Sequence, residues 1–265
     1  MNTNSNTYTV IYSIGLVVVV AAVLAFVAKF LQPMQDENVK KDTISQILTA
    51  ADINFRDDNV LEVYKDSIKI AFTVNQEGVP TDTLETKDIK NLQVYSTSDL
   101  KEQLTKQNAF PVYEFENVVV IPCYGAGLWG PIWGYVGVSK ADYATITKAC
   151  FGHKSETPGL GAKITEERPV FADHFANKQI IRDSITVNKE TGKKEIEKSG
   201  FYFEVAKTNS RKPEAINNGV DAISGATITS QAVGKALNTW FGFYQGYFST
   251  KAPIYAETTT DEQKN

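Results

Sequence analysis

The feature that most constrains this chain is its first 28 residues, which contain no Asp, Glu, Lys or Arg. The remainder carries all 27 Lys and Arg and all 31 Asp and Glu residues. Inside the charge-free stretch lies an apolar run, residues 10–28 (VIYSIGLVVVVAAVLAFVA). As a helix this run would extend about 28 Å, close to the roughly 30 Å hydrocarbon thickness of a bilayer. We therefore expect a single-pass helix over residues 10–28, with the lipid bilayer as its partner.

Two other interpretations of this segment are a cleaved signal peptide and a buried helix of a soluble protein. No Lys or Arg precedes the run, and the run is longer than the 7–15 residues typical of the apolar region of a signal peptide. A Val-rich helix that is apolar on every face fits lipid better than a soluble core. Pro33 is expected to end the helix. These features predict a tail and span at 1–33, a domain at 34–250 and a polar tail at 251–265.

The charges around the span favour a cytoplasmic location for the large C-terminal part. Lys29, Lys40 and Lys41 follow the span, and no basic residue precedes it. The positive-inside rule then places the C-terminal part in the cytoplasm.

The net charge of the chain is −4, which leaves no basic field that would hold a polyphosphate. Nucleic acid is therefore not expected as a partner.

Beyond Pro33 the sequence alternates between helix and strand patterns, which predicts one mixed α+β domain. A long helix is expected to close the domain, because apolar side chains keep helical spacing from Val233 to Phe248. The other expected segments are a short helix that follows a cap at Asp42–Thr43, a strand at 68–74, a turn at 76–78, a polar loop or insertion at 75–100, a strand–turn–strand unit at 117–139, a charged turn at 188–194 and a strand at 201–205.

The sequence predicts no metal site and no catalytic side chains. His153 and His174 lie 21 residues apart, and Cys123 and Cys150 lie 27 apart, so neither pair has the spacing of a zinc site. An iron–sulfur cluster would need more thiolates. There is also no P-loop, nucleophile elbow or dinucleotide-binding fingerprint followed by a helix. Cys123 and Cys150 are compatible with a disulfide or with two buried thiols.

Two glycine-containing stretches are candidates for ligand binding. Residues 125–130 (GAGLWG) are followed by Pro131 and a strand, so they form either a wide hairpin turn or a loop that lets a planar ligand approach beside Trp129 or Trp133. Residues 155–161 (SETPGLG) form either an ordinary Pro-Gly turn or a rigid loop with exposed backbone N–H groups. Lys163 follows closely and could meet an anion.

The most specific stretch is residues 221–230 (DAISGATITS), which run directly into the closing helix. Small side chains keep this place open, and the start of a helix offers unpaired N–H groups that accept a phosphate. The hydroxyl of Thr227 could form an ester with that phosphate. The alternative use of these residues is a helix cap, made by Thr229 or Ser230.

The segment DAISGAT resembles the flavinylation motif D-x-x-S-G-A-T, in which a flavin transferase joins FMN by a phosphoester to the final threonine. The N-terminal span, GLWGPIWGY and HKSETPGLGAKI agree with the same family and occur in the same order. Together they resemble the C subunit of the sodium-translocating NADH:quinone reductase over nearly the whole chain. Gly130-Pro131 departs from the more polar stretch that relatives often carry.

The resemblance implies one covalent FMN on Thr227, in an α+β FMN-binding domain that follows a single N-terminal transmembrane helix. The FMN-binding residues that it implies are Ser224, Gly225, Ala226 and Thr227, with Leu128, Trp129, Glu156, Thr157, Gly159 and Leu160 from the other two loops. Lys163 is our own addition, as a partner for the phosphate.

The resemblance also implies a setting for the chain. Such a protein relays electrons within a bacterial inner-membrane complex and is not active alone. Its partners are the other membrane subunits of the reductase, and a flavin transferase for maturation. Its FMN domain is periplasmic, and we adopt this orientation in place of the one that the charges favour.

Two alternatives differ from this assignment. The G subunit of the Rnf ferredoxin:NAD complex shares the motif and topology, but the polar region 75–100 makes this chain larger than we expect for that subunit. A membrane-tethered module that binds FMN reversibly, without electron transfer, would lack the covalent link.

Overall fold

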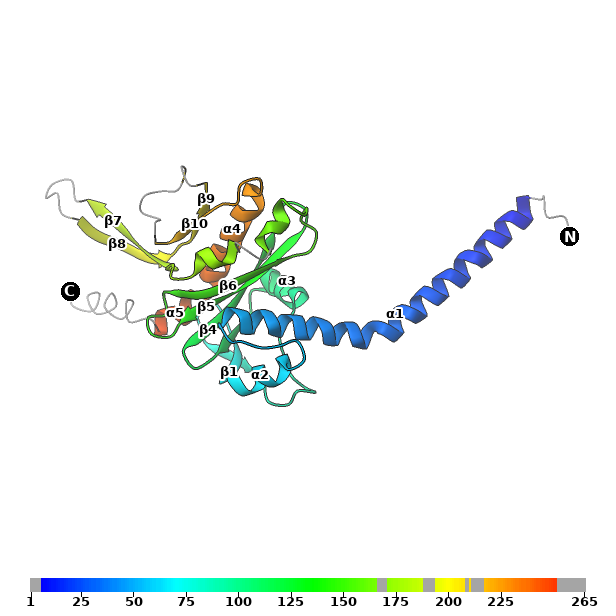
Figure 1. Ribbon diagram of the computed structural model, residues 1–265, viewed down its shortest axis with the longest axis horizontal. Helices are drawn as coiled ribbons and strands as arrows, with labels where there is room; N and C mark the ends of the chain where they lie inside the picture. The colour runs from blue at the N-terminus through cyan, green and yellow to red at the C-terminus, as the bar shows by residue number, and fades with distance from the viewer. Residues whose placement is uncertain (1–5, 166–170, 188–193, 208–209, 211–216, 252–265) are drawn as a thin grey trace. The chain divides into compact units, whose positions relative to one another are not determined.

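The computed structural model describes residues 6–165, 171–187, 194–207, 210 and 217–251 (Figure 1). The chain divides into two compact units, Met1–Asp42 and Thr43–Asn265. The second unit contains the sheet and all the described helices that follow Ala50.

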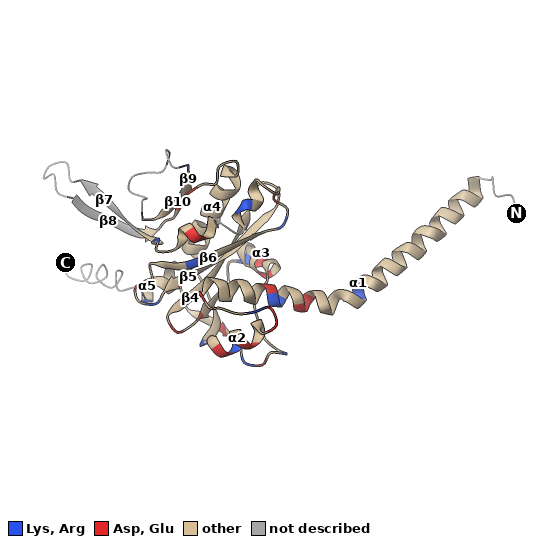
Figure 2. Ribbon diagram, viewed as in Figure 1, with Lys and Arg blue, Asp and Glu red and all other residues tan. Residues whose placement is uncertain are grey.

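Helix α1 (Asn6–Ala50) contains the apolar run. The most apolar part of α1 has a mean hydropathy of 2.9, and none of it is buried inside the protein. Figure 2 shows no charged residues over the N-terminal part of α1. Length and composition therefore make α1 the one helix among the described residues that could cross a membrane.

The expected end of this helix at Pro33 is wrong, because α1 passes through Pro33 and ends at Ala50. Proline removes one intrahelical hydrogen bond but does not by itself end a helix whose flanking turns are stabilised. The last turns are stabilised by burial, since Ile44, Ile47 and Leu48 are fully buried in the second unit. The short helix expected after Asp42 is therefore the last part of α1.

The core of the second unit is a six-stranded antiparallel sheet in the order β2-β1-β3-β4-β5-β6. Its longest ladder joins β4 to β5 and pairs Val118 with Ser139 at one end and Ala126 with Pro131 at the other. This hairpin confirms the strand–turn–strand prediction for residues 117–139. The strands are β1 (Ile70–Val74), β2 (Pro80–Thr83), β3 (Phe110–Glu114), β4 (Val118–Ala126), β5 (Pro131–Ser139) and β6 (Ile146–His153).

Helices cover both faces of this sheet. Helix α4 (Thr227–Phe243) packs on the face of Gly125, where the indole of Trp240 donates to the carbonyl of Tyr124 at 2.8 Å. On the opposite face, the indole of Trp133 donates to Gln46 in the last turns of α1 at 2.9 Å. The other helices of the unit are α2 (Val60–Ser67), α3 (Thr97–Lys106) and α5 (Gln245–Lys251).

The remaining elements lie between β6 and α4 in the sequence. Two short 3₁₀ helices, η1 (Gly161–Ile164) and η2 (Phe171–Phe175), pack on β6. Strands β7 (Ile181–Val187) and β8 (Lys194–Phe201) form an antiparallel hairpin. Strands β9 (Glu204–Ala206) and β10 (Gly219–Asp221) form a parallel pair, and the chain passes from β10 into α4.

Three sequence-based boundaries need correction. The polar region 75–100 is not only a loop, because it contains β2 and the start of α3. The expected strand at 201–205 is divided between the end of β8 and β9. The closing helix is interrupted at Tyr244, whose buried hydroxyl donates to the carbonyl of Pro111 at 2.7 Å. Residues 188–193 of the charged turn and residues 252–265 of the tail lie outside the described residues.

Cys123 and Cys150 point to opposite faces of the sheet. Cys123 pairs with Gly134 across β4 and β5, whereas Cys150 pairs with the adjacent residue of β5, Tyr135. Neighbouring positions of a strand face opposite sides, so β5 separates the two thiols and no disulfide joins them. Burial raises the pKa of the Cys123 thiol well above its usual range. The thiol of Cys150 donates to the carbonyl of Gln46 at 3.2 Å.

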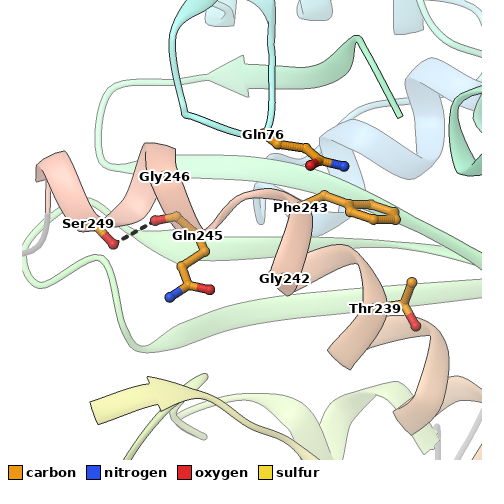
Figure 3. Close-up of a pocket in the computed structure, with 7 residues that line it drawn as sticks. All are labelled: Gln76, Thr239, Gly242, Phe243, Gln245, Gly246 and Ser249. Atoms are coloured by element: carbon orange, nitrogen blue, oxygen red, sulfur yellow. Dashed lines mark hydrogen bonds between the residues drawn. The ribbon is translucent and has the colours of Figure 1, made fainter. Parts of the chain in front are cut away.

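Two glycines hold the turn between β1 and β2 against the start of α5. A Cβ atom on Gly246 would lie 2.3 Å from the carbonyl carbon of Glu77. A Cβ atom on Gly78, where φ is +78°, would lie 2.2 Å from the carbonyl carbon of Gly246. By contrast, a Cβ atom on Gly242, which Figure 3 labels near the end of α4, would meet nothing within 4 Å.

This contrast predicts opposite effects for two matched substitutions. Gly246→Ala should lower the free energy of unfolding by about 1–3 kcal/mol, because backbone atoms must move to admit the methyl group. Gly242→Ala, in an exposed helical position, should leave stability unchanged or raise it by up to about 1 kcal/mol. Urea unfolding of the full chain in detergent, followed by circular dichroism, measures both changes. Equal unfolding free energies for the two variants would contradict the close backbone contact.

Candidate functional site

Three segments that are distant in sequence meet at the N-terminal end of α4. They are the turn between β4 and β5 (127–130), the loop after β6 (155–161) and the segment that leads into α4 (224–229). They surround a cleft of about 380 Å³. The cleft is lined by Leu128, Trp129, Glu156, Thr157, Leu160, Gly161, Lys207, Gly225, Ala226, Thr227, Ile228 and Thr229.

The structure brings most of the sequence-predicted site residues together. Leu128, Trp129, Glu156, Thr157, Leu160, Gly225, Ala226 and Thr227 all line the cleft. Ser224, Gly159 and Lys163 are not among its lining residues, although Ser224 and Gly159 belong to the same segments. The fold therefore gathers into one site three loops that are separate in the sequence.

Four lining residues were not named among the expected FMN-binding residues: Gly161, Lys207, Ile228 and Thr229. Three of them lie inside the candidate stretches 155–161 and 221–230, so the sequence did indicate their segments. Lys207 has no such signal, since its position depends on the pairing of β9 with β10. In that pair Ala206 lies opposite Asp221, and the N–H of Ala222 donates to the carbonyl of Ala206 at 2.8 Å.

The first turn of α4 presents backbone N–H groups to the cleft. Ala226 is the N-cap and makes no side-chain capping bond, and Thr227 is the first helical residue and half-buried. The N–H groups of a first turn have no intrahelical acceptor and carry a partial positive charge. This end of α4 is therefore suited to an anion.

The expected capping roles of Thr229 and Ser230 are wrong. The Ser230 hydroxyl donates to the carbonyl of Ala226 at 2.8 Å and accepts the N–H of Ile223 at 3.1 Å. The Thr229 hydroxyl donates to the carboxylate of Glu156 at 2.7 Å. Both hydroxyls therefore stabilise the start of α4 and the segment that leads into it. Neither hydroxyl caps the N–H groups at the start of α4.

The mouth of the cleft is apolar. Four large side chains there stay exposed, by 50% for Leu128, 67% for Trp129, 49% for Leu160 and 60% for Ile228. The hydroxyl of Ser155 donates to the carbonyl of Trp129 at 2.9 Å, which ties the first loop to the second. A rim of this kind can pack against a planar aromatic ring.

Among the described residues, Lys207 is the one lining residue with a positively charged side chain. It is exposed and follows β9. Lys163 lies instead in η1 and is half-buried. The cleft thus combines an apolar rim, a helix N-terminus, a hydroxyl on Thr227 and one cation.

A second hollow, of about 560 Å³, lies along α4 and α5 and has a different character (Figure 3). It contains no charged side chain and none of the sequence-predicted site residues. Its lining is Gln76, Thr239, Gly242, Phe243, Gln245, Gly246 and Ser249. The cleft at the start of α4 is therefore the candidate site.

Comparison with known proteins identifies the same region. The FMN-binding domain family matches residues 127–242, from the β4–β5 turn to the end of α4. The chain is 30% identical to the C subunit of the Na⁺-translocating NADH-quinone reductase of Parabacteroides distasonis. That crystal structure matches with a TM-score of 0.64 over 82% of this chain and 96% of its own.

Relatives from other bacteria agree with this match. The C subunit of the same reductase in Haemophilus ducreyi is 27% identical over 90% of this chain and 90% of its own length. The corresponding protein of Chlamydia muridarum is 36% identical over 45% of this chain, a match that spans 36% of the relative. Both the fold and the sequence therefore agree over most of the chain. The chain belongs to the family of C subunits of the Na⁺-translocating NADH-quinone reductase.

Proposed function

We propose that this chain is an electron-carrying subunit of a membrane-bound, sodium-translocating NADH:quinone oxidoreductase, with one FMN joined by a phosphoester to Thr227. The observation that supports this most strongly is the position of Thr227. It begins α4 and lines the cleft, where the flavinylation-like motif meets two other family motifs. The relatives supply the coarser part of the proposal, since they are named as subunits of this oxidoreductase and the chain matches an FMN-binding domain.

The residues of the cleft fit the parts of an FMN group. The first turn of α4 offers N–H groups for a phosphate, and the hydroxyl of Thr227 is the candidate for the ester bond. Gly225 has φ of +80°, a backbone conformation that favours glycine, so a glycine turns the chain into the helix. The apolar rim of Leu128, Trp129, Leu160 and Ile228 offers surfaces for the flavin ring.

When bound, FMN supplies the redox chemistry, and the chain supplies attachment, orientation and electrostatic environment. A covalent link retains the carrier in an exposed site. The sequence has no dinucleotide-binding fingerprint followed by a helix, so NADH oxidation is assigned to another subunit. One helix of the described chain has the length and composition to span a membrane, so ion transport is likewise assigned to the other membrane subunits. A flavin transferase is the proposed partner for maturation.

We place the FMN domain on the periplasmic side of a bacterial inner membrane, as the family resemblance implies. Helix α1 supports a membrane anchor, because no other described part of the protein buries its apolar segment. Lys29, Lys40 and Lys41 alone would favour the opposite orientation.

Replacing Thr227 tests the covalent link directly. Thr227→Ala removes the hydroxyl, so co-expression with a flavin transferase should yield no flavin fluorescence on a denaturing gel viewed under ultraviolet light. Thr229→Ser keeps a hydroxyl two residues away and should retain the fluorescent band. A band that persists in Thr227→Ala would reject Thr227 as the attachment point. Tight but non-covalent flavin in the wild-type chain would favour the reversible binding module.

Lys207 and Lys163 form a matched pair for testing the phosphate site. Lys207→Gln should slow covalent flavin incorporation by up to about fivefold, because an exposed charged contact contributes at most about 1 kcal/mol. Lys163→Gln should have little effect, since Lys163 does not line the cleft. Initial rates of incorporation into the purified apo chain, measured at low and high salt, provide the comparison. A larger effect from Lys163→Gln would reverse the assignment and make Lys163 the partner of the phosphate.

The orientation is tested by protease treatment of sealed, right-side-out membrane vesicles. A periplasmic domain should be digested without detergent, whereas a cytoplasmic domain should be digested only after detergent is added. A cytoplasmic control protein must stay protected in the same vesicles. Protection of the domain would overturn the periplasmic assignment and support the orientation that the charges favour.

A further inference from the structure

The carboxylate of Glu156 makes two hydrogen bonds inside the chain and is almost completely buried. Its residue is 4% exposed, although it lines the cleft. One oxygen, Oε1, accepts the backbone N–H of Trp129 at 2.8 Å. The other, Oε2, accepts the hydroxyl of Thr229 at 2.7 Å. A single side chain of the second loop therefore connects the β4–β5 turn to the first turn of α4.

Two glycines leave the space that this carboxylate occupies. A Cβ atom on Gly127 would lie 2.5 Å from Oε1 of Glu156, and one on Gly161 would lie 2.2 Å from Oε2. Any larger residue at either position would displace the carboxylate. One glycine of each motif, Gly127 or Gly161, is thus explained by the accommodation of Glu156, rather than only by the approach of a ligand.

The carboxylate of Glu156 depends on its two hydrogen-bond donors, because no cation pairs with it among the described residues. Among the ion pairs of the described residues, none involves Glu156. A buried carboxylate without a cation is unfavourable unless donors compensate for the lost water. The two hydrogen bonds and the positive end of α4 supply that compensation. If the N–H of Trp129 or the hydroxyl of Thr229 moved away, the carboxylate would lose one of its two hydrogen-bond donors. The carboxylate therefore opposes movement of the β4–β5 turn and of the first turn of α4.

We propose that Glu156 is a positioning residue that forms the cleft before the cofactor arrives. Thr227, the proposed attachment residue, lies in the same helical turn as Thr229. By holding the Thr229 hydroxyl, Glu156 fixes this turn relative to Trp129 at the rim. The inference rests on the proposed function for the identity of the cofactor, but the two hydrogen bonds belong to the chain alone.

The same carboxylate has an electrostatic effect on the site. Reduction adds negative charge to a flavin, and a buried carboxylate that lines the cleft opposes that charge. Glu156→Gln keeps the shape of the side chain and removes its charge. The flavin of this variant should therefore have a higher midpoint potential than the wild-type flavin, a change that loss of packing alone would not produce in a fixed direction.

A double-mutant cycle tests the hydrogen bond without any flavin. Glu156→Gln, Thr229→Val and the double variant are unfolded in urea as apo chains, all in a Thr227→Ala background. Thr229→Val should shift the unfolding midpoint strongly when Glu156 is present and much less when it is replaced. Thr239→Val is the matched control, because this exposed hydroxyl on the same helix donates only to the Lys235 carbonyl. Its shift should be the same in both backgrounds, and additive effects of Thr229→Val would overturn the proposal.

Flavin incorporation and redox titration test the positioning role in the chain that retains Thr227. Glu156→Gln and Thr229→Val should both slow covalent incorporation at least tenfold, whereas Thr229→Ser, which keeps the donor, should restore most of the rate. If the wild-type chain takes up no flavin, the proposed function fails, while the apo cycle still decides the role of Glu156. If the wild-type chain is loaded and Glu156→Gln matches its rate and potential, the positioning role fails alone.

Discussion

The site depends on the packing of α4 against β4. The buried indole of Trp240 donates to the carbonyl of Tyr124, and Gly125 lies so close to Ala236 that a Cβ there would stand 2.8 Å from the alanine methyl. A hydrogen bond and a close contact between small residues set both the rotation and the height of the helix over the sheet. Because the C-terminal half of α4 is anchored in this way, its N-terminal turn can remain open to solvent without losing its position.

The helix thus has two chemically distinct halves. Its C-terminal half supplies the aromatic core, in which Phe110 stacks on Phe243 with ring centroids 4.6 Å apart and meets Trp240 edge-on. Its N-terminal turn supplies three hydroxyl side chains and the exposed Ile228, and it has no side-chain cap. The hydroxyls of Thr229 and Ser230, which the sequence suggested as caps, make other hydrogen bonds. Thr229 donates to Glu156, and Ser230 donates to the carbonyl of Ala226. Stability and ligand binding therefore occupy different ends of one helix.

The sequence predicted the parts of the fold that rest on local patterns. A glycine-rich turn between two apolar runs indicated the β4–β5 hairpin, and helical spacing indicated most of α4, because both signals depend on neighbours along the chain. The break at Tyr244 escaped prediction, because apolar side chains keep helical spacing through it as far as Phe248. The continuation of α1 through Pro33 also depended on tertiary burial of Ile44 and Ile47, which outweighs a local preference.

In the candidate site, too, the sequence predicted what lies in local motifs and missed what depends on tertiary contacts. The three motifs contain most of the lining residues, because each motif is a contiguous stretch with an unusual composition. Lys207 could not be found in this way, since the parallel β9–β10 pair brings it to the cleft. The hydrogen bonds of Glu156 were equally inaccessible. Its partners lie 27 and 73 residues away, and nothing in the residue types distinguishes a carboxylate that faces a ligand from one that holds two loops.

The arrangement of the two cysteines has a practical consequence for any redox measurement on this protein. Cys123 and Cys150 are the only cysteines of the chain, and the sheet keeps their sulfur atoms on opposite sides. The fold therefore contains no cystine that dithionite or a thiol reagent could cleave. A reductive titration of the loaded chain would report on the electron carrier alone, with no unfolding superimposed on the optical signal.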